Sequence, residues 1–404
     1  MKLVDELRAR GFIEQMTYPE ELEEKLNDGK LTFYAGFDCT ADSLTVGHYL
    51  LICLFKHLQK HGHKAICMIG GGTTMIGDPS GRNDMRKLMS REFIDHNAEC
   101  FERQLSSLLN MDGEHGIFMN NKDWLLDLNF LDFVREIGTE FSVNRMLQFD
   151  CYKTRLDKGL TFFEFSYMLM QSYDFLKLYR EENCTLQVGG NDQWSNMLGG
   201  YELVRKLENA TVYNMTIPLL TTADGVKMGK SMGNAIWLDK EKTSPFDFYQ
   251  YFRNVDDRDV IRFMKVLTFL PLDEIERIEK EEDINRQKEI LAYEITKDIH
   301  GKEEADNAIN TARALFSGKI NAENMPEFEL DAAKAADGIG LLNLLVETGI
   351  CKSNSEGRNL VKGGGISIND EKVSDPSMTV SLEELKDEII IQKGKKTFLK
   401  VYVK

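Results

Sequence analysis

The sequence predicts an α/β fold in which a Rossmann-like parallel sheet is followed by an α-helical domain and a small C-terminal α+β domain. Two apolar runs, residues 31–38 (LTFYAGFD) and 65–72 (AICMIGGG), are short and end in Asp or Gly, as buried parallel strands do. Between them, apolar residues recur at helical spacing from Leu50 to Leu58. A strand, a helix and a second strand in this order predict a right-handed crossover, and therefore an open α/β sheet.

The later elements continue this alternation. Residues 162–180 are expected to form a helix, 184–190 (CTLQVGG) a strand, 192–207 a second helix and 211–220 (TVYNMTIPLL) the last strand. A polar, glycine-bearing loop at 221–234 comes next.

These elements suggest a division of the chain into domains. We expect a Rossmann-like catalytic domain at 1–220, which carries an inserted helical connective segment at about 95–185. Charged helical periodicity predicts an α-helical domain that, together with the preceding loop, spans 221–320. Residues 321–337 lose this periodicity and are expected to be a linker, and a compact, turn-rich domain follows at 338–404.

Composition and charge argue against several classes of protein. The net charge of −16 argues at first against a nucleic-acid partner, and we expect no DNA binding. Residues 338–404, however, hold 10 Lys and Arg against 9 Asp and Glu and are compatible with a local RNA contact. No apolar run approaches the ~18 residues of a membrane span, and the N-terminal residues do not resemble a signal peptide. The seven cysteines include no CxxC pair, so we expect reduced thiols, no structural metal and a cytoplasmic location.

Two stretches have residue types that suit phosphate binding. Gly47 and His48 stand at the start of the first helix, where free N–H groups and the helix dipole favour an anion, although a histidine there is also commonly structural. The loop DGVKMGKSMGN carries Lys227 and Lys230 on either side of Gly229. Such lysines can neutralise the charge of a leaving pyrophosphate, and a solvated basic loop is the alternative.

A third stretch, GGGTTMIGDPSGR, follows the second predicted strand and matches neither a P-loop nor the GxGxxG pattern. Its Asp78, with Arg82 and Arg86 close behind, combines one acceptor with two guanidinium groups. This set suits an ammonium group and phosphates, and a flexible turn is the alternative.

The order of these stretches resembles a known family. TVGH, followed some 180 residues later by KMGKS, resembles the HIGH and KMSKS signatures of class I aminoacyl-tRNA synthetases. The stretches YAGFDCTADSLTVGH, GGTTMIGDPSGR, FFEFSYMLMQSYDF and VGGNDQWSNM narrow the resemblance to the bacterial tyrosyl-tRNA synthetases. The resemblance extends, in order, over essentially the whole chain.

The resemblance implies roles for individual residues. For tyrosine binding it implies that Tyr34 and Asp174 contact the phenolic hydroxyl, whereas Asp78, Tyr167 and Gln171 hold the α-ammonium group. Phenylalanine would leave the first two side chains without a partner, which is costly in a buried slot.

The resemblance further implies a site for ATP, the second substrate, with Mg²⁺ as its counterion and no dedicated protein cage for the metal. The residues implied at the ATP site are Gly36, Asp38, Thr40, Gly47, His48, Gly190, Asp192 and Lys230, with Gln193 reaching the tyrosine carboxyl region. The residues implied in catalysis are Thr45, His48, Arg82, Arg86, Lys227, Lys230 and Ser231.

The C-terminal residues 338–404 resemble an S4-type RNA-binding domain, in which Ser353, Arg358 and Lys362 stand at the usual RNA-binding positions. Such domains bind structured RNA by its shape and phosphates. The implied partner is tRNA(Tyr), bound across a homodimer. Candidates for an apolar dimer face are Phe130, Leu131, Phe162 and Phe163.

The sequence departs from the family pattern in places. Thr45 replaces the first His of HIGH, and Gly229 replaces the first Ser of KMSKS; Cys39 stands where Pro is usual, and Arg82 where Lys is common. Two other functions therefore stay open: a related ligase or nucleotidylyltransferase such as a tryptophanyl enzyme, and a synthetase-derived RNA-binding protein that has lost catalysis. The pair Tyr34 and Asp174 argues against the first.

Overall fold

The structure is a computed structural model. It describes residues 1–80, 89–156, 159–228, 235–316, 326–335, 338–369, 371–394 and 397–403. The chain divides into two compact units. The first consists of Met1–Lys242 and Asp256–Gln287, and the second of Thr243–Val255 and Lys288–Lys404.

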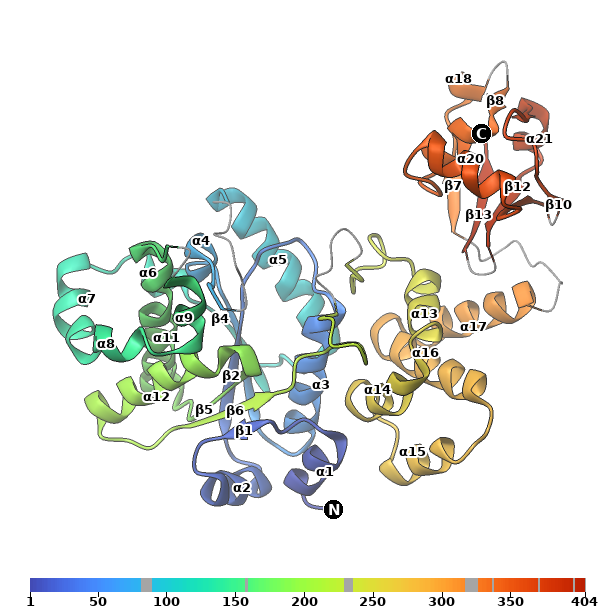
Figure 1. The fold of residues 1–404 in the computed structure, drawn as a ribbon. Coiled ribbons are helices and arrows are strands. Elements are labelled where there is room, and N and C mark those ends of the chain that lie inside the picture. The colour runs from blue at the N-terminus through green and yellow to red at the C-terminus, as the bar shows by residue number, and fades with distance from the viewer. Residues whose placement is uncertain are drawn as a thin grey trace. The chain divides into compact units, whose positions relative to one another are not determined.

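A twisted sheet with the strand order β1-β6-β5-β2-β3-β4 forms the centre of the first unit (Figure 1). Each neighbouring pair from β6 to β4 is parallel, and the edge strand β1 runs antiparallel to β6. The strands are β1 (Gln15–Met16), β2 (Thr32–Phe37), β3 (Lys64–Ile69), β4 (Gly116–Asn120), β5 (Leu186–Gly190) and β6 (Tyr213–Ile217). The expected α/β class with a parallel sheet is confirmed.

Helices cover both faces of this sheet because side chains of a strand alternate between the faces. In β2, Phe33 packs against Phe55 of α3 (Val46–Lys60) with ring centroids 4.7 Å apart. The next residue, Tyr34, packs against Phe175 of α11 (Tyr167–Glu182) at 5.2 Å. Thus α3 and α11 lie on opposite faces, and Tyr34 points toward α11.

The other helices of the first unit are short or amphipathic. They are α1 (Leu3–Arg10), α2 (Pro19–Asp28), α4 (Thr73–Ile76), α5 (Arg91–Leu108), α6 (Lys122–Leu125), α7 (Phe130–Glu136), α8 (Val143–Met146), α9 (Asp150–Leu156), α10 (Phe162–Phe165), α12 (Trp194–Glu208), α14 (Val260–Leu267) and α15 (Leu272–Glu279). Short 3₁₀ turns lie at Gly138–Glu140, Asn191–Gln193 and Asp257–Asp259. Within the described part of the chain, no helix is long and apolar enough to span a membrane.

The second unit contains a helical part and a C-terminal α+β part. The helices of the first part are α13 (Pro245–Arg253), α17 (Lys302–Phe316) and most of α16 (Ile284–His300). The C-terminal part has a sheet in the order β10-β9-β12-β13-β7 and a strand pair β11-β8. Its elements are β7 (Glu327–Glu329), α18 (Ala332–Ala335), β8 (Ile339–Gly340), α19 (Leu341–Glu347), α20 (Asn354–Lys362), β9 (Ile366–Ile368), β10 (Glu371–Lys372), β11 (Thr379–Val380), α21 (Leu382–Lys386), β12 (Ile389–Lys393) and β13 (Thr397–Tyr402).

Three details differ from the expectations. Strand β4 lies inside the segment 95–185, for which only helices were expected, because a five-residue run with one buried residue has little periodicity. The helix expected at 162–180 is divided at Ser166 into α10 and α11. Residues 326–335, expected within a linker, form β7 and α18 instead.

The segment that was expected to be a linker belongs to the C-terminal part. Strand β7 pairs in parallel with β13, and Leu330 and Ala335 are buried in the same apolar cluster as Leu344 and Val401. A three-residue strand needs its partner strand to be stable, and that partner lies about 70 residues away in the sequence.

Candidate active site

A cavity of about 220 Å³ opens at the carboxyl ends of β2, β3 and β5. The chain leaves β2 for β3 on one side, and β5 later pairs with β2 on the other side. In an open α/β sheet, such a reversal of strand order leaves a crevice between the loops that follow the strands. The structure brings twelve of the predicted site residues to its wall: Tyr34, Gly36, Asp38, Thr40, His48, Asp78, Tyr167, Gln171, Asp174, Gly190, Asp192 and Gln193.

Asp174 of α11 is a buried carboxylate at this cavity, with 1% of its surface exposed. One of its oxygens accepts a hydrogen bond from Trp124 Nε1 (2.7 Å), and the other accepts one from Asn121 Nδ2 (3.0 Å). Burial raises the pKa of Asp174 to about 7, although these two donors oppose the rise. The carboxylate is held in place and still has lone pairs for a further donor.

Tyr34 and Gln171 each present a buried polar atom to the same cavity. Neither the hydroxyl of Tyr34 nor Gln171 Oε1 has a hydrogen-bond partner among the described residues. Burial, followed by the nearby charge of Asp174, raises the pKa of Tyr34 well above its ordinary value. Because a buried polar group without a partner is costly, these two atoms indicate where a ligand's polar groups bind.

A second buried carboxylate, Asp78, lies at another wall of the cavity. It accepts hydrogen bonds from Gln193 Nε2 (2.6 Å), Asn196 Nδ2 (3.3 Å) and the backbone N–H of Ser80 (2.9 Å). Burial raises the pKa of Asp78, and the negative charge of Asp38 adds to the rise. A cation bound here would relieve both effects.

Asp38 follows β2 and is held by two hydroxyl groups. Thr73 Oγ1 donates to one oxygen (2.9 Å), and the phenol of Tyr167 donates to the other (3.0 Å). A side chain at Gly70 would be 2.4 Å from Asp38 Oδ1, so the backbone of that glycine approaches closely. The described residues that line the cavity include four aspartates and no lysine or arginine, so the cavity suits an ammonium group better than a phosphate.

His48 lies where α3 begins, and Thr45 is the N-cap of that helix. The backbone N–H of Thr45 donates to His48 Nδ1 (3.0 Å), and Thr45 Oγ1 lies 3.1 Å from the same nitrogen. Because an amide N–H can only donate, Nδ1 is an acceptor and a neutral ring carries its proton on Nε2. Thr45 therefore orients the histidine, in addition to capping the helix.

A smaller groove of about 170 Å³ is lined by Thr45, Gly47, His48, Asp192 and Lys227. His48 and Asp192 also line the larger cavity, so the two hollows adjoin. Lys227 Nζ lies 3.3 Å from Asp192 Oδ2, and its side chain is 45% exposed. An exposed ion pair of this kind is weak, so an anionic ligand can compete for the lysine.

Comparisons with known proteins agree with this geometry. Residues 26–317 match the family model described as tRNA synthetases class I (W and Y), and residues 319–401 match that of the Tyrosine--tRNA ligase SYY-like C-terminal domain. The chain is 52% identical to a tyrosine--tRNA ligase of Acetivibrio thermocellus over 98% of both chains, and 52% identical to one of Clostridium kluyveri over 99% of both. The chain belongs to the tyrosyl-tRNA synthetases. This family consists of aminoacyl-tRNA ligases, so the chain is an enzyme of that class, and the relatives do not favour the non-catalytic alternative.

A solved structure of the same family supports the fold. A C-terminally truncated mitochondrial tyrosyl-tRNA synthetase of Aspergillus nidulans superposes with a TM-score of 0.71 at 31% identity. The match covers 78% of this chain and 94% of that one.

Four residues implied in catalysis lie outside the described residues: Arg82, Arg86, Lys230 and Ser231. Conversely, Asn121 and Trp124, which hold Asp174, were not predicted from the sequence. They follow β4, a strand with too little periodicity to be predicted, so the sequence does not mark the loop after it as the end of a strand. The stretch NNKDW directly after an apolar run was the available signal.

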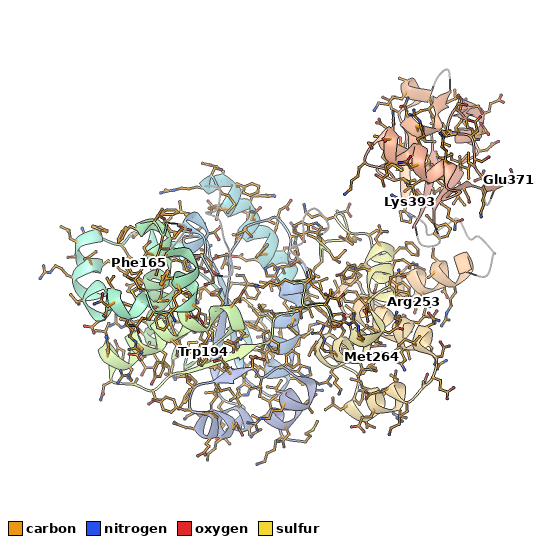
Figure 2. The ribbon with its side chains drawn as sticks, in the orientation of Figure 1. Phe165, Trp194, Arg253, Met264, Glu371 and Lys393 are labelled. Carbon is orange, nitrogen blue, oxygen red and sulfur yellow. The ribbon has the colours of Figure 1, made fainter. Side chains whose placement is uncertain are left out.

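The residues implied in RNA binding lie on α20 and at its N-cap. Ser353 caps the helix by accepting a hydrogen bond from Glu356 N (3.3 Å). Arg358 and Lys362 are exposed and four residues apart, so they share one helix face. Lys393 (Figure 2) donates to the carbonyl of Ile350 (2.7 Å) and to Glu356 (2.9 Å), which fixes the start of this helix.

Proposed function

We propose that the chain activates L-tyrosine with ATP, forming tyrosyl-AMP and pyrophosphate, and then transfers the tyrosyl group to tRNA(Tyr). The observation that carries this proposal is the hydroxyl of Tyr34, which is buried in the cavity that Asp174 also lines and has no hydrogen-bond partner within the described part of the chain. A phenolic hydroxyl satisfies both residues, since it can accept from Tyr34 and donate to Asp174.

The α-ammonium group of tyrosine would lie near Asp78, Tyr167 and Gln171. Asp78 supplies a buried acidic group, and Gln171 Oε1 supplies an acceptor that no described residue pairs with. This arrangement directs the tyrosine carboxylate toward His48 and Asp192, which belong to both hollows. ATP would occupy the groove, with its ribose near Asp192 and Gly190.

In the first step, a carboxylate oxygen of tyrosine attacks the α-phosphorus of ATP, and the bond to the pyrophosphate oxygen breaks. Gly47 lets the phosphates approach the N-terminus of α3, and His48 Nε2–H is directed by the contact of Nδ1 with Thr45. Lys227 leaves its ion pair with Asp192, pairs with the leaving pyrophosphate and offsets the negative charge that develops on it. In the second step, a hydroxyl of the terminal adenosine of tRNA attacks the tyrosyl carbonyl, and AMP leaves.

Mg²⁺ would enter as the counterion of the ATP phosphates. Asp192 is the only carboxylate among the described residues that line the groove, and it is already paired with Lys227. One carboxylate fits a metal held mostly by phosphate and water oxygens rather than by a protein cage.

The assembly we propose is a cytoplasmic homodimer. Phe130, Leu131 and Phe162 have 65%, 68% and 71% of their surfaces exposed, and large apolar side chains this exposed are candidates for an interface. All seven cysteines are free and buried, which suits a reducing compartment. The tRNA would contact the exposed face of α20 with Arg358 and Lys362, in a C-terminal domain of the S4 type.

The proposed function is tested by ATP–pyrophosphate exchange with each of the twenty amino acids. We expect exchange that depends on tyrosine, and none with phenylalanine at the same concentration. Lys227→Ala should slow the exchange without changing the dissociation constant of tyrosine, whereas Lys240→Ala, at an exposed lysine outside the groove, should change neither. If tyrosine supports no exchange, the proposed activity is wrong.

A further inference from the structure

The segment that carries Lys227 is a β-hairpin. Met228 N donates to the carbonyl of Leu220 (2.8 Å), and Thr222 N donates to the carbonyl of Val226 (2.8 Å). Thr221 and Lys227 are paired in an antiparallel bridge between these two contacts. The position of the lysine backbone therefore depends on where this hairpin, residues 220–228, is held.

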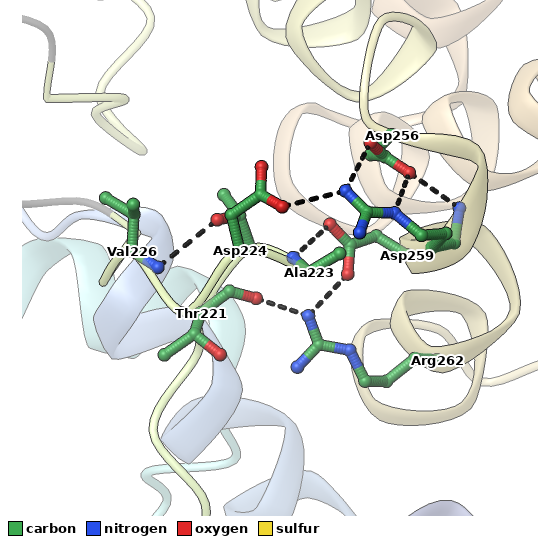
Figure 3. Close-up of polar contacts among 9 residues, drawn as sticks. Thr221, Ala223, Asp224, Val226, Asp256, Asp259 and Arg262 are labelled. Carbon is green, nitrogen blue, oxygen red and sulfur yellow. Dashed lines mark hydrogen bonds and ion pairs between the residues drawn. The ribbon is translucent and has the colours of Figure 1, made fainter.

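The hairpin is fastened to the turn that precedes α14 (Figure 3). Asp259 accepts a hydrogen bond from Ala223 N (2.9 Å) through one oxygen and is paired with Arg262 (2.6 Å) through the other. Arg262 also donates to the carbonyl of Thr221. Asp259 and Arg262 thus hold the first arm of the hairpin at Thr221 and the start of its turn at Ala223.

The contacts that fasten the hairpin differ in burial, and the more buried ones contribute more to holding it. In the pair of Arg262 and Asp259 the arginine side chain is 44% exposed, but the carboxylate is only 2% exposed, so removing a partner leaves a buried carboxylate uncompensated. A further pair, Arg258 and Asp224 at 2.9 Å, is 59% and 74% exposed and is therefore weak. We call Asp259 and Arg262 together the anchor of the hairpin.

The base of the anchor is closely packed. Helix α14 follows it directly and buries Val260, Phe263, Met264 and Leu267. Arg10 of α1 donates to the carbonyls of Lys265 and Thr268 at the end of α14. Helix α14 also packs against α3, whose first turn contains His48. Helix α14 is therefore packed against the same unit that holds α3, and this packing supports the anchor.

We propose that Asp259 and Arg262 are positioning residues for tyrosine activation. By fastening the hairpin they place Lys227 opposite the N-terminus of α3, where the pyrophosphate leaves. Neither residue lines the cavity or the groove, so their effect passes through Lys227. This inference rests on the proposed function, and it adds two residues that no signature of the sequence contains.

The test is a double-mutant cycle on the full-length chain. Arg262→Gln should lower the rate of tyrosine-dependent pyrophosphate exchange by about ten- to a hundredfold, the scale of misplacing a catalytic group by about 1 Å. The dissociation constant of tyrosine, measured by calorimetry, should not change. In a Lys227→Ala background the same substitution should have less than a threefold further effect, because its route to the reaction is already removed.

Several variants control the experiment. Arg262→Lys keeps the charge and one donor and should recover part of the rate, which also tests the contact if Arg262→Gln folds poorly. Arg277→Gln removes an exposed pair with Asp273 (3.9 Å; 73% and 82% exposed) on α15 and should change nothing.

The outcomes distinguish this proposal from the proposed function. If the unsubstituted chain shows no tyrosine-dependent exchange, the function itself fails. If the chain is active, an unchanged exchange rate in Arg262→Gln overturns the proposal that the anchor positions Lys227. An equal loss with and without Lys227, or a loss of tyrosine affinity, overturns it as well.

Discussion

The pKa of Asp174 predicts that tyrosine binds more tightly as the pH rises from 6 to 8. Burial raises this pKa to about 7, so the side chain is mostly neutral at pH 6 and mostly ionised at pH 8. Its two oxygens already accept from Trp124 and Asn121. The phenol of tyrosine is a third donor, and the ionised carboxylate accepts it much more strongly than the protonated carboxyl group does.

The magnitude follows from the fraction of ionised Asp174. With a pKa of about 7, this fraction rises about tenfold between pH 6 and pH 8, which corresponds to about 1.4 kcal/mol in binding free energy. The dissociation constant of tyrosine should fall by the same factor. At pH 6, binding should also release nearly one proton, because the bound phenol stabilises the ionised form.

The assay is isothermal titration calorimetry with tyrosine at several pH values. Repeating it in two buffers with different ionisation enthalpies counts the released protons. Asp174→Asn cannot titrate and should remove the pH dependence, and any slope that remains in this variant belongs to Asp78, whose pKa burial also raises. A dissociation constant that stays constant or rises between pH 6 and 8 in the unsubstituted chain would refute the reasoning.

Four further predictions concern stability and individual residues. The folded-state pKa of Asp174 lies above its ordinary value of 3.8, so the free energy of unfolding should fall by at most about 4 kcal/mol as the pH rises from about 4 to 7. Urea denaturation at several pH values measures this fall, and the Asp174→Asn variant should show a flatter profile over the same range. Tyr34→Phe should weaken tyrosine binding by about 1 kcal/mol, the scale of one neutral hydrogen bond, and leave phenylalanine binding unchanged; calorimetry that shows equal losses for both amino acids would contradict the assigned contact. Thr45→Val should slow adenylate formation about fivefold while tyrosine affinity stays constant. Thr45→Ser keeps the hydroxyl and should retain the rate. If stopped-flow measurements show an unchanged rate in the valine variant, the Thr45 hydroxyl has no role in the reaction. Arg358→Glu should weaken tRNA binding in a filter assay without changing pyrophosphate exchange, and the affinity of the unsubstituted chain should fall with added salt.

Much of the site could be predicted because signature residues occupy positions fixed by local structure. The alternation along β2 places Tyr34 on the face opposite Phe33, and the helical start after Thr45 directs Gly47 and His48 toward the groove. These placements depend on neighbours within a few residues, which a sequence displays directly.

Other parts could not be predicted because they depend on partners far away in the sequence. Asn121 reaches Asp174 across 53 residues, and it does so only because β4 joins the sheet beside β3. The strand β7 exists because β13 supplies its partner. Short elements of this kind have little periodicity of their own, so tertiary pairing decides whether they form.

The sequence by itself determined the α/β class, most of the order of the elements, and the residue types that we propose to meet tyrosine and ATP. The tertiary structure decided what holds those residues: the donors on Asp174, the contact of Thr45 with His48, and the attachment of the Lys227 hairpin to Asp259. The physical reason is that a hydrogen bond between distant segments requires both to be placed within about 3 Å. That placement results from the packing of the whole sheet and its helices, and no local pattern of residues contains it.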